Sequence, residues 1–231
     1  MFYWGLDWTY VVIVLPVMIL AFIASARVSS TFKKYSKVQL SYATTGAEAA
    51  RMILDHNGLY NVKIERIGGE LTDHFDPRTN VLRLSDAVYS SSTPAAVGVA
   101  AHEAGHAIQY AKEYQPMKVR AAIIPICNFG SSLAMPLFLL GLLFAMPTLS
   151  YVGIAFFGLA ALFQAVTLPV EFNASKRAMK ALEGSFRFTE DELDGSKKVL
   201  TAAALTYVAA LATSLAQILR LLVIVGGRRR D

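Results

Sequence analysis

The sequence predicts a mainly α-helical membrane protein with one small α+β domain and three or four transmembrane helices. Its 231 residues are 55% hydrophobic with a mean hydropathy of +0.44, a larger apolar share than soluble domains usually have. The apolar residues gather in long runs, and about 20 such residues suffice to span a bilayer. A polar stretch with capping and turn signals lies between the first two runs. This division predicts a membrane-embedded part and one polar domain.

The first apolar run covers residues 10–26, and we expect a transmembrane helix over residues 8–27. Aromatic residues favour membrane interfaces, and basic residues favour the cytoplasmic side. The run is preceded by Trp4 and Trp8 and followed by Arg27, Lys33, Lys34 and Lys37. Its C-terminal end is therefore predicted to face the cytoplasm. A cleaved signal peptide is disfavoured because its basic residues would precede the apolar run.

Residues 36–120 form the predicted polar domain. A capping box at Thr45 starts a helix that ends near Gly58. Three short strands are expected at residues 61–67, 70–75 and 80–84. Thr93 then provides the N-cap of the next helix, with a proline at the first helical position. Because the last strand directly precedes this helix, residues 81–84 are predicted to line a cleft and pair with substrate backbone.

The C-terminal half contains three more apolar runs. The first two, joined by an uncharged loop, predict a membrane hairpin over residues 123–168. The chain then returns to the cytoplasm, where residues 169–200 are expected to form polar helices. Residues 201–225 either form a fourth span, lie at the membrane interface or pack on the polar domain. If residues 201–225 span the membrane, the basic tail, residues 226–231, would lie outside the cell, although basic residues usually lie on the cytoplasmic side.

The strongest chemical signal is an H-E-x-x-H sequence, in which Glu103 directly follows His102 and His106 ends the motif. Helical residues four apart lie one turn apart on the same face, so both imidazoles can reach one metal ion. Glu103 points about 100° away, which suits a group that acts on a metal-bound water. The pattern is typical of zinc hydrolases. Gly105 costs about 1 kcal/mol in helix propensity, which a close-packed neighbour or the metal would explain.

The third zinc ligand is predicted to be a carboxylate. A catalytic zinc usually takes three protein ligands, and no histidine follows His106. We favour Glu171, which the predicted topology places on the same side of the membrane as the histidines. Asn173 and Ser175 follow it as candidate hydrogen-bond partners of the ligands. Asp194 is the alternative, because site-2-type intramembrane proteases use the aspartate of an L-D-G sequence as third ligand.

Other residues carry weaker signals. His74 is either a cleft-facing group that binds substrate or steadies an intermediate, or an ordinary turn residue, and we retain it with Glu103 as a candidate catalytic residue. Tyr110 and Tyr207 are candidate oxyanion donors. The lone cysteine, Cys127, excludes an intramolecular disulfide and a Cys-based zinc site. The net charge of +5 is explained by basic residues beside apolar runs, so no nucleic-acid partner is expected.

Several segments together resemble the YugP-type bacterial membrane zinc metallopeptidases. They are A-A-H-E-A-G-H-A-I-Q (100–109), L-T-D-H-F-D-P (71–77), V-L-R-L-S (81–85), L-P-V-E-F-N-A-S (168–175) and L-T-Y-V-A-A (205–210). The resemblance covers nearly the whole chain and implies zinc ligation by His102, His106 and Glu171, with Glu103 catalytic. More distantly the chain resembles HtpX-type proteases, whose third ligand heads an E-x-x-A-D motif. Here Ser175 stands at the place of that aspartate.

These observations predict a membrane-anchored zinc endopeptidase of gluzincin type, with a zincin-like domain and one Zn²⁺ per chain. We expect it in the bacterial plasma membrane, with its active site on the cytoplasmic side and peptides or membrane proteins as substrates. A non-catalytic zinc-binding membrane scaffold and a site-2-type intramembrane protease are the alternatives. A metal-ion carrier is disfavoured because the second and third spans contain no ionisable group beyond Cys127.

Overall fold

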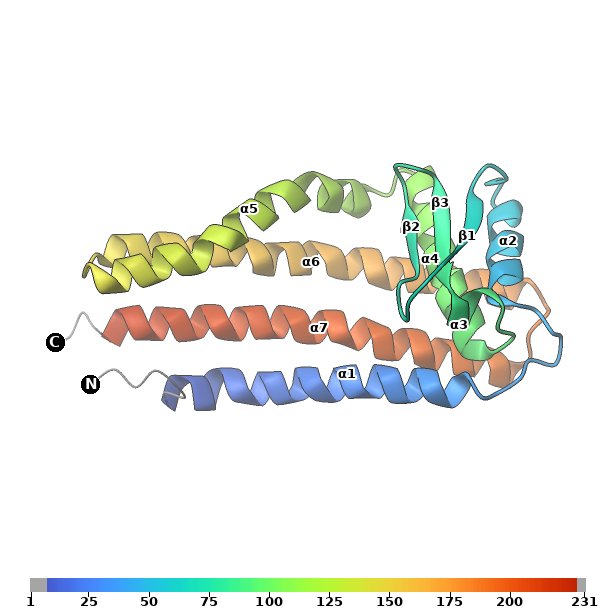
Figure 1. Ribbon diagram of the computed structural model, residues 1–231, viewed down its shortest axis with the longest axis horizontal. Coiled ribbons are helices and arrows are strands. Elements are labelled where there is room, and N and C mark those ends of the chain that lie inside the picture. The colour runs from blue at the N-terminus through green and yellow to red at the C-terminus, as the bar shows by residue number, and fades with distance from the viewer. Residues whose placement is uncertain (1–7, 228–231) are drawn as a thin grey trace. The chain divides into compact units, whose positions relative to one another are not determined.

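A computed structural model describes residues 8–227 (Figure 1). Trp4 and the arginines at 228–230, which entered the topology prediction, lie outside the described residues. In chain order the elements are η1 (Tyr10–Val14), α1 (Leu15–Tyr35), α2 (Gly46–His56), β1 (Lys63–Ile67), β2 (His74–Asp76), β3 (Val81–Ser85), α3 (Asp86–Tyr89), α4 (Pro94–Ala111), α5 (Gln115–Leu143), α6 (Pro147–Gly184) and α7 (Glu190–Gly227).

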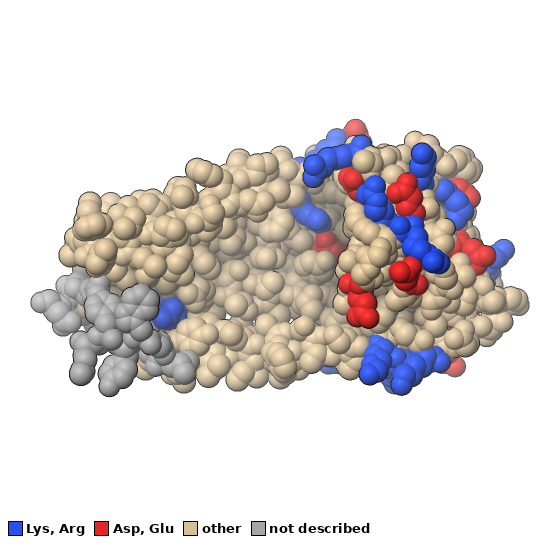
Figure 2. All heavy atoms as spheres, viewed as in Figure 1, with Lys and Arg blue, Asp and Glu red and all other residues tan. Residues whose placement is uncertain are grey.

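The predicted fold class is confirmed. Four helical stretches of the described chain are long and apolar enough to cross a membrane: Tyr10–Tyr35, Gln115–Leu143, Pro147–Gly184 and Glu190–Gly227. The three strands form one small sheet. The chain divides into a helical unit (Met1–Ser25, Lys118–Leu168 and Leu205–Asp231) and a polar unit (Ala26–Met117 and Pro169–Ala204). Figure 2 shows charged side chains gathered over the polar unit, whereas the visible face of the helical unit carries almost none.

The apolar segments continue without a break into the polar segments that follow them. α6 runs through Pro169, and α7 runs from its acidic first turn to Gly227. A proline removes one backbone hydrogen bond and can bend a helix without ending it when neighbouring groups satisfy the carbonyls. Glu171 therefore lies on the same continuous helix as the third apolar run.

The helical unit contains a closely packed hairpin of α5 and α6. A Cβ atom on Gly153 would lie 2.5 Å from the backbone nitrogen of Phe138, so the two helices touch where only glycine fits. Small residues of this kind allow close helix packing inside membranes. The turn between the helices contains Ala145, which has a positive φ of 53°.

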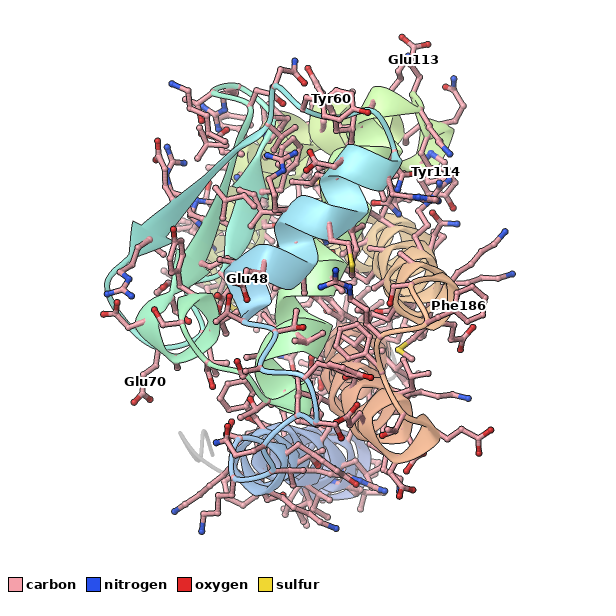
Figure 3. The ribbon with its side chains drawn as sticks, turned by 90° about the vertical axis from the view of Figure 1, so that its right-hand side faces the viewer. Glu48, Tyr60, Glu70, Glu113, Tyr114 and Phe186 are labelled. Carbon is pink, nitrogen blue, oxygen red and sulfur yellow. The ribbon has the colours of Figure 1, made fainter. Side chains whose placement is uncertain are left out.

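The polar unit is built around α4. Its alanine-rich surface packs against α2 and against β2 and β3 (Figure 1), and most of its residues are buried. The capping box and the helix starts predicted here are confirmed. Thr45 and Glu48 bond reciprocally at the start of α2 (Glu48 is labelled in Figure 3), and Thr93 Oγ1 accepts the Ala96 N–H at 3.3 Å at the start of α4. The packing of α4 against α2, β2 and β3 is expected, because a helix that is apolar on nearly all sides is buried in the core of a protein.

The order of the strands in the sheet contradicts the substrate-binding role predicted for residues 81–84. β3 is the central strand, parallel to β1 and antiparallel to β2. The prediction that residues 81–84 pair with substrate backbone is therefore wrong, because both edges of β3 already pair within the sheet. The strand prediction placed the right segments near β1, β2 and β3, but each predicted strand began too early, the second by four residues. The short helix α3 was not predicted.

Candidate metal centre

Two histidines of α4 form the first half of the site. His102 and His106 lie one helical turn apart, and their ring centroids are 4.7 Å apart with planes at 86°. Both side chains are partly buried, with exposed fractions of 15% and 12%. The helical spacing predicted this pairing, because residues four apart share a helix face.

Glu171 of α6 completes a group of three. Its Oε2 lies 3.2 Å from Nε2 of His102 and 3.5 Å from Nε2 of His106. The three ligand atoms lie within 4.8 Å of one another. Among the described residues this is the one group of histidine, cysteine and carboxylate ligands with such spacing. Asp194, the alternative ligand, instead pairs with Lys198 at 2.5 Å on an exposed part of α7.

The other ring nitrogens have hydrogen-bond partners of their own. Nδ1 of His102 lies 3.1 Å from Ser175 Oγ, and Nδ1 of His106 lies 3.0 Å from Gln109 Oε1. A histidine that donates from Nδ1 leaves the lone pair of Nε2 for a metal. Two such nitrogens and one carboxylate oxygen, facing one another, are a donor set that suits a catalytic zinc. The residues present therefore fit this metal.

Gln109 is the member of the site that sequence analysis missed. Its side chain is fully buried (0% exposed), and its Nε2 donates to Val170 O at 2.8 Å and to Asn173 Oδ1 at 3.0 Å. Asn173 was predicted to support a ligand, but it reaches His106 only through Gln109. The available signal was spacing: Gln109 follows His106 by three residues and therefore lies near the same helix face.

Gly105 explains how closely the two ligand-bearing helices approach. A Cβ atom at this position would lie 2.6 Å from Ala174 O and 3.3 Å from Ala174 Cα. The close-packed neighbour predicted from the propensity of Gly105 is thus confirmed, and it is the backbone of α6. Ala174 lies between Glu171 and Ser175, so this contact holds both next to the histidines.

Glu103 lies beside the ligands and is partly buried. Its Oε2 accepts the backbone N–H of Phe75 in β2 at 3.1 Å. Burial raises the pKa of Glu103, and the neighbouring His102 and His106 partly oppose the rise. Burial alone would lower the pKa of His106, but the hydrogen bond to Glu171 and the nearby carboxylates outweigh it, so this pKa is raised. Raised carboxyl pKa values in a cleft are typical of proton-transfer groups.

β2 is the strand next to Glu103, and it also carries His74. Phe75 packs into the core against the ring of Tyr110, with centroids 6.0 Å apart. Neighbouring strand residues point to opposite faces, so His74 points to the other face, where its Nδ1 lies 2.7 Å from Thr72 O. The contact with Glu103 thus comes from Phe75, and a catalytic role for His74 stays a prediction. Tyr207 belongs to the helical unit.

Comparison with known proteins agrees with this geometry. A family model described as "Putative neutral zinc metallopeptidase" matches residues 10–226. The chain is 48% identical over 205 residues to a Bacillus subtilis (strain 168) protein described as "Putative membrane protease YugP", covering 89% of this chain and 91% of that protein. No solved structure matches the chain.

Proposed function

The chain belongs to the neutral zinc metallopeptidase family, and from this premise we propose that it is a membrane-anchored zinc-dependent endopeptidase. The observation that supports this most directly is the meeting of His102, His106 and Glu171, with Glu103 beside them. One Zn²⁺ per chain would be held by Nε2 of each histidine and a carboxylate oxygen of Glu171.

Zinc bound there would supply a Lewis acid and lower the pKa of a bound water toward neutrality. Glu103 is the general base. The Phe75 N–H occupies its Oε2, which leaves Oε1 to accept the proton of the attacking water and then pass it to the leaving amine. In the metal-free protein, burial raises the pKa of Glu103, which is the environment of a carboxyl group that exchanges protons. His74 remains a candidate substrate contact on the opposite face of β2.

The substrate is a peptide segment that lies extended beside β2. β2 is an edge strand of the sheet, and it is in direct contact with Glu103. Edge strands bind extended peptides through backbone hydrogen bonds. This replaces β3 as the proposed substrate strand, with the Phe75 N–H bonded to Glu103 and therefore not among the groups that the substrate would use.

We propose that the protein resides in the bacterial plasma membrane with the site on the cytoplasmic side. The support is the positive-inside preference: the basic residues after the first apolar run, from Arg27 to Lys37, belong to the same polar unit as the metal centre. Peptides and membrane-protein segments near the bilayer are then the accessible substrates.

The test combines metal content with cleavage. Purified full-length protein in detergent should contain one zinc per chain, and Glu171→Ala should lose most of it. Glu103→Gln should keep the zinc but lose cleavage of fluorescently labelled casein and of a mixed peptide library. Wild-type activity in zinc-loaded Glu103→Gln would refute the general-base role. Full zinc content without any cleavage by the wild type would favour the non-catalytic scaffold.

A further inference from the structure

A chain of hydrogen bonds connects His106 with an arginine that is not near the ligand atoms themselves. His106 Nδ1 lies 3.0 Å from Gln109 Oε1, and Gln109 Nε2 donates to Asn173 Oδ1 at 3.0 Å. Asn173 Oδ1 also accepts from Arg177 Nε at 2.7 Å. The guanidinium of Arg177 is held over the ring of Tyr114, labelled in Figure 3, at 5.9 Å from its centroid.

Each amide in this chain has one permitted orientation. Arg177 can only donate, so the oxygen of Asn173 must face it; the reversed amide would bring two donors together at 2.7 Å. The same oxygen then requires the nitrogen of Gln109. Val170 O, which can only accept, imposes the same orientation on Gln109 from 2.8 Å. The oxygen of Gln109 is thereby turned toward His106.

The orientation of Gln109 places an acceptor beside Nδ1 of His106. Nδ1 therefore carries a proton, and Nε2, which faces Glu171, is the nitrogen whose lone pair a metal ion between them would take. His102 has no such control, because Ser175 offers a hydroxyl that can donate or accept. The two histidine ligands therefore differ, although they occupy equivalent places in the H-E-x-x-H sequence.

We propose that Gln109 is a positioning residue for the metal centre: it is oriented by Val170 O and by Asn173, which Arg177 holds in turn, and it keeps Nδ1 of His106 as the donor so that Nε2 is the nitrogen that binds zinc. The proposal rests on the proposed zinc site. It assigns Gln109 as the direct partner of the ligand and Arg177 as the fixed donor at the far end of the chain.

The first measurement is zinc affinity of the purified full-length protein, by competition with a chromogenic chelator. Gln109→Met should weaken binding about 10- to 100-fold, the usual effect of removing a partner of a metal-bound histidine. Arg177→Met and Asn173→Leu should weaken it less. Asn173→Asp, which keeps an acceptor for both neighbours, and Arg177→Lys, which keeps a donor, should restore most of the affinity. Lys176→Met removes an equal, exposed charge and should leave affinity unchanged.

The second measurement is the tautomer itself. The chain has four histidines, so ¹⁵N-histidine labelling gives a readable ring spectrum. In metal-free wild type, Nδ1 of His106 should carry a proton, because it faces Gln109 Oε1. Gln109→Met, which removes this acceptor, should shift the proton toward Nε2 and Glu171. Arg177→Met and Asn173→Leu should shift it less, because Val170 O still orients Gln109, and an unchanged spectrum in Gln109→Met would show a purely structural role. His102 should respond in none of these variants.

The outcomes separate this proposal from the proposed function. The double variant Gln109→Met/Arg177→Met should bind zinc no more weakly than Gln109→Met, since Arg177 acts through Gln109. Additive losses, an unchanged tautomer, or an equal loss in Lys176→Met would each overturn the proposal. If Arg177→Met does not fold, Asn173→Leu against Asn173→Asp gives the same test. If the wild type binds no zinc, the proposed function fails, and the tautomer still decides the positioning role.

Discussion

Replacing Gly105 by alanine should lower the zinc affinity of the protein while the protein stays folded. The added methyl raises helix propensity by about 1 kcal/mol. Its Cβ, however, would lie 2.6 Å from Ala174 O, and this contact must lengthen to at least 3.0 Å before the atoms fit. Overpacking of this kind costs about 1–3 kcal/mol. The net loss in free energy of unfolding is therefore about 0–2 kcal/mol.

The effect on the metal centre should be larger. Moving Ala174 displaces Glu171 and Ser175 relative to the histidines, whereas metal–ligand distances in proteins stay within about 0.2 Å of their usual values. We expect zinc affinity to fall by about 10-fold or more, while the protein stays folded. Gly158→Ala is the matched control, since nothing lies within 4 Å of its added Cβ, and it should gain up to about 1 kcal/mol.

The assay is thermal unfolding in mild detergent, with and without zinc, together with chelator competition. Zinc should raise the melting temperature of wild type and Gly158→Ala by similar amounts and that of Gly105→Ala much less. The reasoning is refuted if Gly105→Ala binds zinc like the wild type and is stabilised as much as Gly158→Ala.

Three further predictions concern single hydrogen bonds. Ser175→Ala should weaken zinc binding about 10-fold in the chelator competition without changing the tautomer of His106; unchanged affinity would show that the 3.1 Å contact with His102 does not support the ligand. Thr93→Ala should lower the free energy of unfolding by about 1 kcal/mol in denaturant titrations, and Thr93→Ser should not. Hydrogen bonds from Thr45 hold the pKa of Glu48 below its usual 4.5, so its carboxylate stabilises the fold above that pH and stops doing so as the pH falls. Metal-free Glu48→Gln should therefore lose less stability than metal-free wild type between about pH 5 and pH 3; parallel curves would contradict this.

The three residues that meet at the candidate metal centre could be predicted because their signals are local or chemical. The four-residue spacing of His102 and His106 needs only helix geometry. Glu171 followed from the shortage of downstream ligands and from counting membrane crossings. Thr45 and Thr93 are helix caps whose partners lie three residues ahead in the chain, so no tertiary information was needed.

What could not be predicted depends on contacts between distant segments. The sequence alone does not determine the order of three short strands within a sheet. Here β3 is the central strand, and β2 is the strand next to Glu103. Gln109 looks like an ordinary polar helix residue until α6 covers it. Gly105 signalled a close neighbour, but only the packing of α4 on α6 identified Ala174.

The order of the ligands along the chain has a consequence for biosynthesis. His102 and His106 precede α5, and Glu171 follows most of the long helix α6. The apolar runs of α5 and α6 must therefore both be made before Glu171 leaves the ribosome. Until then a nascent chain holds only two of the three candidate metal ligands. If the protein is the peptidase that we propose, it acquires its complete set of ligands only after this hairpin has been synthesised.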